Sequence, residues 1–339
     1  MIYNLHVLRV IAALAVVYYH STSDAGLNLE LSFGSRGVDV FFVISGFIIA
    51  YIGSNNPKQF LRRRMLRVVP FYWAATLVVF AIACVLPNLF HQTRADVPQL
   101  VCSLLFLPRE TSYAGLFPTL ILGWSLNYEM YFYFAFTGAL ALSKRYAPLV
   151  CCGIIAVILV VINLIGTDNP SVGFYGRGIV LEFAYGIGVY YAMKWIELRK
   201  EALVRFAAGK WLLLLVVVGA LGFVGWGELN GFDEYPRYLV AGIPAFFIVL
   251  GAILLERIYG WKIDNKTVYL LGEASYILYL VHPYVIYTIL RLGVTHLSLT
   301  PVTTAVVIAG LLAVSSAVAM AIHVAFERPV MAALRARLL

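Results

Sequence analysis

The sequence predicts an all-α integral membrane protein with about ten transmembrane helices. Of its 339 residues, 62% are apolar and 12% are charged, and the mean hydropathy is +0.87. A soluble domain of this length would carry about twice that share of charged residues. The apolar runs are long and continuous rather than alternating, which indicates membrane helices and not the strands of a membrane barrel.

Ten segments are long enough to cross a bilayer, since a span needs about 17–25 mainly apolar residues. Prolines stand at or near their ends or in the connections, as helix breakers do. The first segment contains Arg9 and lacks a small-residue cleavage site, so we interpret it as a retained span rather than a signal peptide. The predicted spans are 5–21, 37–53, 68–87, 119–142, 148–166, 176–194, 211–227, 237–256, 271–291 and 301–326.

Lysine and arginine are unevenly distributed over the connections between these spans. If the N-terminus is cytoplasmic, the inner connections carry about three times as many basic residues as the outer ones. This asymmetry predicts that both termini lie in the cytoplasm. It also accounts for the net charge of +8 without a nucleic-acid partner. We expect a single transmembrane domain over 1–339, with no appended soluble domain.

Two further features of the connections and the cysteines bear on the fold. In the long 88–118 connection, the apolar part 97–107 is too short to span, which favours a re-entrant or interfacial segment between the third and fourth spans. The four cysteines have no metal-ligand spacing, so we expect structural thiols and no metal. A Cys84–Cys102 disulfide is the alternative.

Arg9 and His20 make the first span a candidate for function. They are eleven residues apart, close to three full helical turns, so both lie on one stripe of a helix with a rise of about 16 Å between them. A charge within a span costs roughly 3 kcal/mol, which makes Arg9 a functional candidate. The alternative is that Arg9 reaches the near interface and His20 ends the helix at the far one.

Polar residues of three spans are predicted to gather near His20 in the outer half of the membrane. Asp39 begins the second span, and Ser125 and Glu129 share a face of the fourth. A carboxylate beside a histidine fixes its tautomer and raises its basicity, so Asp39 and Glu129 are candidate catalytic partners of His20. The alternative is that interfacial residues merely share a depth.

Five cations occupy one short inner connection. Arginine forks bind phosphate oxygens, so this cluster favours a polyphosphate ligand, whereas anchoring to anionic lipid is the alternative. Arg64 and Arg67 point the same way if the third helix begins early. The five residues are Lys58, Arg62, Arg63, Arg64 and Arg67.

The ninth span carries a polar stripe of Ser275, Tyr279 and His282, spaced four and then three residues apart. We interpret this stripe as lining of the substrate path, together with Tyr276, Trp124 and Ser125. Two further carboxylates, Glu182 and Glu327, lie outside this stripe. Glu182 has no partner that the sequence suggests, and Glu327 is expected to pair with basic residues at the cytoplasmic surface.

A basic inner mouth, with a histidine about 16 Å further out, suits a ligand with a charged nucleotide head and a long thin arm. Acyl-coenzyme A has this shape. His20 would then act as general base on an acceptor hydroxyl, oriented by Glu129 or Asp39, and the thiolate would leave. A covalent acyl-histidine intermediate is the variant of this mechanism.

The same residues carry a family resemblance over nearly the whole chain. The matching pieces, in order, are Arg9 with His20, the 37–47 segment GVDVFFVISGF, Arg64-x-x-Arg67 with Pro70, Trp124-Ser125-Leu126 with Glu129, Ser275-Tyr276 through His282, and Glu327-Arg328-Pro329. In them the chain resembles the membrane-bound acyltransferase 3 family, in its short exopolysaccharide-modifying form.

The resemblance implies an O-acyltransferase in a bacterial inner membrane. It would use cytoplasmic acyl-CoA, often acetyl-CoA, as co-substrate. The acceptor would be a cell-envelope carbohydrate or lipid-linked glycan. The resemblance also implies that Arg9 and His20 are essential and that Arg64 and Arg67 bind the donor. We place Arg9 and Arg63 with them as candidate donor-binding residues. A transporter or flippase of an anionic envelope metabolite is the alternative, although the inverted repeats typical of transporters are not evident. A membrane sensor or scaffold is a third hypothesis.

Overall fold

The computed structural model describes residues 2–23, 32–55, 57–87, 89–90, 92–205, 208–231, 235–291 and 300–338. The structure is 82% helical, and no strand forms within these ranges. The predicted all-α class is therefore confirmed.

A long helix of the described residues corresponds to each of the ten predicted spans. They are α1 (Tyr3–Ser23), α2 (Gly37–Asn55), α3 (Phe60–Val85), α5 (Gly123–Leu142), α6 (Ala147–Ile165), α8 (Leu181–Glu197), α10 (Gly209–Leu229), α11 (Ile243–Tyr259), α12 (Lys266–Ile289) and α13 (Pro301–Ile322). The shorter helices are η1 (Ser32–Arg36), α4 (Val97–Leu104), α7 (Pro170–Tyr175), η2 (Gly178–Val180), α9 (Lys200–Arg205), η4 (Tyr238–Gly242), η6 (His323–Glu327) and α14 (Arg328–Leu338).

Within the described ranges, seven helical segments are long and apolar enough to cross a membrane. They cover all or most of α1, α2, α3, α6, α10, α11 and α13. The predicted spans outside this set are α5, α8 and α12, which carry the polar residues Glu129, Glu182 and His282. Polar side chains lower the hydropathy of a helix that lines an internal site. The chain is thus a membrane protein, while the predicted total of ten crossings and the predicted side of the termini stay predictions.

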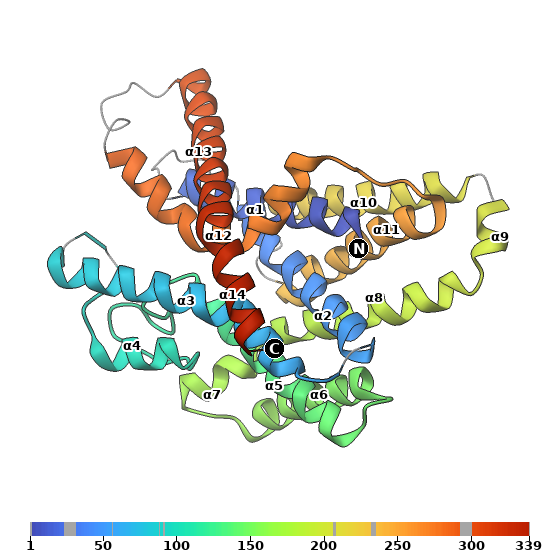
Figure 1. Cartoon of the computed structure of the whole chain (residues 1–339), viewed down its shortest axis with the longest axis horizontal. Coiled ribbons are helices and arrows are strands. Elements are labelled where there is room, and N and C mark those ends of the chain that lie inside the picture. Colours follow the sequence, from blue (N-terminus) through green and yellow to red (C-terminus); the bar gives the residue numbers. More distant parts are fainter. Residues whose placement is uncertain are drawn as a thin grey trace.

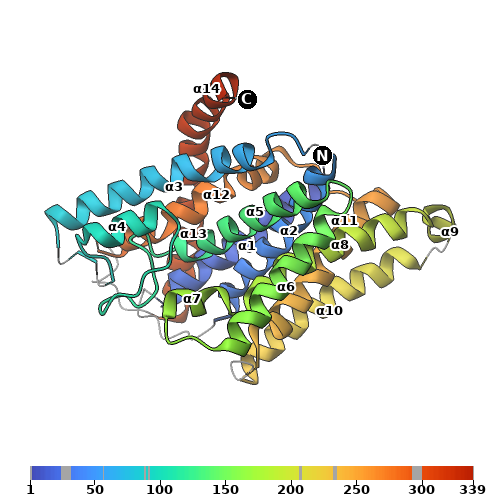
Figure 2. The same cartoon turned by 90° about the horizontal axis from the view of Figure 1, so that it is seen from below.

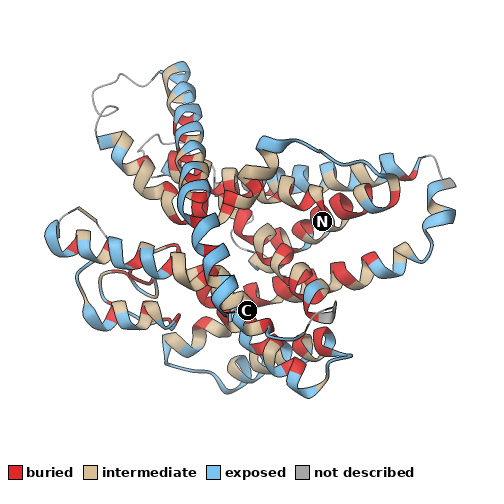
Figure 3. Ribbon diagram, in the orientation of Figure 1, coloured by how far each residue is buried: buried red, intermediate tan, exposed pale blue. Residues whose placement is uncertain are grey.

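The surface of the molecule is apolar where its outer helices face outward. Only 6% of the most apolar window of α10 is buried, against 67% for the segment that contains α11. Large side chains such as Trp211, Leu215 and Trp226 are therefore exposed on α10. Figure 3 shows that buried residues concentrate where the central helices cross. An apolar exterior around a packed interior suits a hydrocarbon surrounding.

Helices α1 and α2 lie at the centre of the molecule, with the other long helices around them (Figure 1). α1 packs against α2, α11, α12 and α13. α2 crosses α8 closely, because Gly46 and Gly186 face each other. A Cβ on Gly46 would lie 2.2 Å from the Phe183 carbonyl oxygen, and one on Gly186 would lie 2.2 Å from that of Val43. Small residues at such a crossing allow two backbones to touch.

The N-terminal end of α1 is anchored to the end of α11. The carboxylate of Glu256 accepts the backbone N–H groups of Tyr3 at 3.0 Å and Asn4 at 2.7 Å, which satisfies donors that a helix leaves open. The Asn4 amide donates to the carbonyls of Ala252 and Trp261. These bonds set the position of α1 and hence of Arg9, which lies about one and a half turns further along the helix. In Figure 2 both ends of the chain lie towards the same side of the helices.

α3 begins eight residues before the predicted start of its span, at Phe60. Gln59, with a φ of 55°, turns the chain into the helix. Arginine is a good helix former, so the basic stretch that the hydropathy pattern assigns to a connection forms the first turns of α3. The predicted re-entrant part contains a helix of eight residues, α4, which packs against α3. All four cysteines are free thiols.

Candidate functional site

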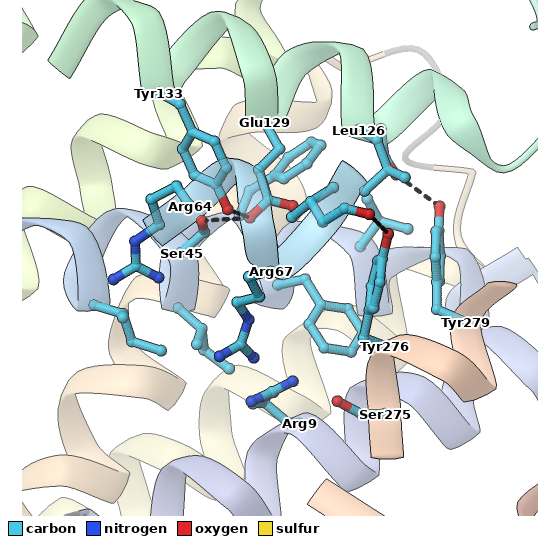
Figure 4. Close-up of a pocket in the computed structure, with 17 residues that line it drawn as sticks. Arg9, Ser45, Arg64, Arg67, Leu126, Glu129, Tyr133, Ser275, Tyr276 and Tyr279 are labelled. Atoms are coloured by element: carbon cyan, nitrogen blue, oxygen red, sulfur yellow. Dashed lines mark hydrogen bonds between the residues drawn. The ribbon is translucent and has the colours of Figure 1, made fainter. Parts of the chain in front are cut away.

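A cavity of about 750 Å³, counted with its open mouth, lies between α1, α2, α3, α5 and α12. Figure 4 shows the side chains that line it. Its polar lining comes from all five helices, so it forms only when the chain is folded. The polar lining residues are Arg9, Ser45, Arg64, Arg67, Ser125, Glu129, Tyr133, Ser275, Tyr276 and Tyr279.

Three arginines gather at one end of this cavity (Figure 4). Because α3 begins early, Arg64 and Arg67 lie on the same helix and both reach the lining. Arg9 joins them from α1. It is repelled by Arg67 and attracted by Glu129. Three arginines against one carboxylate leave an excess of positive charge, which favours an anionic ligand.

Glu129 lies beside the arginines and is held by two hydroxyl groups. Ser45 Oγ donates to its Oε1 at 3.1 Å, and the Tyr133 hydroxyl donates to the same oxygen. Glu129 also attracts Arg64. The spacing of Glu129 and Tyr133 places them one turn apart on α5, a pairing that the sequence contains but that the sequence analysis did not single out. Ser45 gives no comparable signal, because serine is common in helices of this kind.

A hydrogen-bonded pair lines the other end of the cavity. Ser125 Oγ and the Tyr279 hydroxyl are 2.8 Å apart, and Tyr279 also donates to the Leu122 carbonyl at 3.1 Å. Tyr276 donates to the carbonyl of Val68 at 2.7 Å, which ties α12 to α3. The structure thus brings four predicted lining residues, Ser125, Ser275, Tyr276 and Tyr279, to one cavity.

Trp124 lies just outside the cavity lining. Its ring is in edge contact with those of Phe42, which does line the cavity, and Tyr128, at centroid distances of 6.5 and 6.1 Å. Trp124 therefore packs against a residue that lines the cavity without lining the cavity itself.

His20 and His282 form a pair of rings beyond the Ser125–Tyr279 end of the cavity. Their centroids are 5.1 Å apart, and the His282 ring lies 6.2 Å from the Tyr279 ring. His20 is partly exposed, whereas His282 is fully buried. A continuous row of rings therefore connects the cavity to His20, although His20 is outside the cavity lining itself.

Asp39 is fully buried and forms an ion pair with Arg237 rather than a contact in the cavity. Glu182, also fully buried, interacts with Asp39 and with Arg237. The predicted carboxylates thus each have a partner other than His20, since Glu129 binds Ser45 and Tyr133 and Asp39 binds Arg237. Arg237 lies 198 residues from Asp39 in sequence, and no local pattern indicates it as a partner.

The remaining predicted cations lie outside the cavity. Arg63 donates to the Lys58 carbonyl, and Lys58 and Arg62 line a surface groove with Lys144. Of the five cations of this stretch, Arg64 and Arg67 line the cavity, and Arg63 does not. At the C-terminal side, Glu327 pairs with His323, while Arg328 pairs with Glu273.

The chain is similar to known acyltransferases. Residues 2–323 match the acyltransferase domain family. The exopolysaccharide production protein ExoZ of Rhizobium meliloti (strain 1021) is 32% identical over 326 residues, which cover 94% of this chain and 96% of ExoZ. The O-acetyltransferase OatA of Staphylococcus aureus (strain NCTC 8325 / PS 47) is 25% identical over 305 residues, covering 81% of this chain and 49% of OatA.

A third relative is the peptidoglycan O-acetyltransferase OatA of Listeria monocytogenes serovar 1/2a (strain ATCC BAA-679 / EGD-e). It is 27% identical over 306 residues, which cover 81% of this chain and 48% of that protein. The chain thus spans about half the length of both OatA proteins and nearly all of ExoZ. No solved structure matches the chain.

Proposed function

Because the chain belongs to the acyltransferase 3 family, we propose that it transfers an acyl group, acetyl in the simplest case, from acyl-CoA to a hydroxyl of an exported carbohydrate. The observation that carries this proposal is the arginine end of the cavity, joined by a row of aromatic side chains to His20. The arginine end suits the binding of the acyl donor, and His20 suits the removal of a proton from the acceptor hydroxyl.

The arginine end suits the phosphates of the donor. Placing Arg9, Arg64 and Arg67 in the interior of a membrane protein is unfavourable unless anionic groups compensate their charge, and Glu129 supplies one such group. Guanidinium forks bind phosphate oxygens in pairs, which orients a nucleotide head as well as attracting it. Glu129 interacts with Arg9 and Arg64, so we assign it the role of orienting these forks.

The distance along α1 suits the pantetheine arm of the donor. Arg9 and His20 are eleven residues apart on one helix, a rise of about 16 Å. With the phosphates at the arginines, the thioester would pass the Ser125–Tyr279 pair and reach the two histidines. The arginines would then lie towards the cytoplasm and His20 towards the outer face of the inner membrane, with both termini of the chain in the cytoplasm.

At His20 the reaction is an acyl transfer between sulfur and oxygen. His20 removes the proton of the acceptor hydroxyl while that oxygen attacks the thioester carbonyl carbon. A carbon–oxygen bond forms, the carbon–sulfur bond breaks, and the coenzyme A thiolate takes the proton from the imidazolium. The products are the O-acyl carbohydrate and coenzyme A.

The names of the relatives point to glycans of the cell envelope as acceptors. The Listeria protein is named for peptidoglycan, and the protein from Rhizobium for exopolysaccharide. The similarity to ExoZ covers nearly all of both chains, so we propose an exopolysaccharide or its lipid-linked precursor as the acceptor.

The test is the His20→Ala variant, assayed with radiolabelled acetyl-CoA and with deacylated envelope polysaccharide from the host. We expect loss of acyl transfer with an unchanged unfolding temperature in detergent. Mass spectrometry of the polysaccharide from cells with and without the protein identifies the group and the sugar. Normal acyl transfer by His20→Ala would exclude His20 as the base, and an unchanged polysaccharide would exclude the acceptor.

A further inference from the structure

His282 is a fully buried histidine whose ring contacts that of His20. Helices α1 and α12 run in the same direction, with Gly272 against His6 near their starts and His282 against His20 towards their ends. The contact between the two histidines is therefore part of a long helix–helix interface. It is not an accidental approach of two surface side chains.

The hydrogen bond on Nδ1 of His282 fixes which nitrogen carries the proton. Nδ1 lies 2.9 Å from the carbonyl oxygen of Leu278. A carbonyl oxygen only accepts, so Nδ1 is the donor, and in the neutral ring Nε2 then holds the lone pair. Pro283 lacks the N–H that would bond to the Tyr279 carbonyl in a regular helix, so this second carbonyl is also open to a donor. The His282 ring also interacts with that carbonyl.

The Nε2 atom of His282 therefore has a lone pair that can accept a hydrogen bond. Among the described residues, no hydrogen-bond partner of His282 Nε2 is present, although the atom is buried. A buried polar atom in this state is unfavourable and calls for a functional explanation. The neighbouring ring is His20. A hydrogen bond of about 3 Å between two imidazole nitrogens places the ring centres roughly 5 Å apart. The His20 and His282 ring centres are 5.1 Å apart, so a rotation of the His20 side chain would bring the two nitrogens within bonding distance.

We propose that His282 is a positioning residue, whose Nε2 accepts the N–H of the His20 ring. This bond holds His20 in one tautomer and leaves its other nitrogen with the lone pair that removes the proton of the acceptor hydroxyl. The two carboxylates that the sequence suggested as partners of His20 bind other residues, Glu129 to Ser45 and Tyr133 and Asp39 to Arg237. The inference rests on the proposed role of His20 as the base.

The first experiment is kinetic and uses two replacements of His282. His282→Phe removes the acceptor, so kcat should fall about tenfold or more while KM for acetyl-CoA stays within about twofold. His282→Gln carries an oxygen near the place of Nε2, so it should recover most of the lost kcat. A fall in kcat that glutamine does not restore, or a change confined to KM for the donor, would contradict the proposal.

The second experiment observes the histidines directly, by NMR of the protein labelled with ¹⁵N-histidine in detergent. His20→Ala assigns the His20 signals. We expect one tautomer of His20 in the unmodified protein and in His282→Gln, and a mixture of tautomers in His282→Phe. The control is His323→Phe, which removes a buried histidine in η6 and should leave the His20 signals unchanged.

The outcomes separate the two proposals. Full activity of His20→Ala would overturn the proposed function, whatever His282 does. Loss of activity in His20→Ala together with unchanged kcat in His282→Phe would overturn only the positioning role. If His282→Phe does not fold, the kinetics and the NMR spectrum of His282→Gln decide. Retained kcat with a single His20 tautomer supports the proposal, and a mixture of tautomers refutes it.

Discussion

Arg237 holds Asp39 by two hydrogen bonds, from Nε to Oδ1 at 2.8 Å and from Nη2 to Oδ2 at 2.6 Å. A third bond from Arg237 goes to the carbonyl of Ser35, just before the start of α2. The pair therefore joins the beginning of α2 to the beginning of the η4–α11 segment. Asp39 is fully buried, so its charge depends on this partner.

Removal of one member of the Asp39–Arg237 pair should be more damaging than removal of both. Arg237→Met leaves a buried carboxylate without its cation, which should lower the free energy of unfolding by about 3–5 kcal/mol. The double variant Asp39→Ala, Arg237→Met should recover part of this loss. Unfolding in detergent of the two single variants and the double variant measures the coupling. Additive effects would show that the pair contributes little.

Replacement of the different arginines of α3 should have different effects on KM for the acyl donor. Arg64→Ala and Arg67→Ala each remove a guanidinium from the cavity, so each should raise KM for acetyl-CoA about tenfold or more, with little change in KM for the acceptor. Arg63→Ala is the matched control, because Arg63 lies on the same helix but bonds to the Lys58 carbonyl outside the cavity. Steady-state kinetics with each substrate varied gives both constants. An equal effect of all three variants would indicate anchoring to lipid instead of donor binding.

Glu129 has two possible roles that kinetics distinguishes. If it orients the arginines, Glu129→Gln should lower kcat/KM for the donor about tenfold, mainly through KM. Tyr133→Phe, which removes one hydrogen bond to the carboxylate, should show a smaller effect in the same constant. A loss confined to kcat would instead support the sequence-based expectation that Glu129 acts on His20.

The crossing of α2 and α8 should not tolerate a side chain. In Gly186→Ala the added Cβ would lie 2.2 Å from the Val43 carbonyl oxygen, so the helices must separate and the unfolding temperature should fall by several degrees. Gly153→Ala on α6 is the control, since a Cβ there meets no atom within 4 Å and alanine favours a helix. Equal unfolding temperatures of the two variants would show that the crossing adjusts without loss.

The sequence by itself determined the helical class, the approximate positions of ten long helices and most of the polar residues that line the cavity. These features follow from local properties of the sequence. Long apolar runs indicate helices, and a charged residue within such a run is costly and therefore indicates a functional role. The start of α3 was less predictable. Hydropathy assigns the basic stretch before Val68 to a connection, whereas helix propensity continues α3 through it to Phe60.

The partners of the polar residues were decided only by the tertiary structure. Asp39 binds Arg237, Glu129 binds Ser45 and Tyr133, and the ring of His20 lies against that of His282. A helix fixes the depth and the face of a side chain, but the residue opposite it comes from another helix whose rotation and crossing angle depend on packing. Sequence therefore predicts which polar residues share a depth, and packing decides which of them meet.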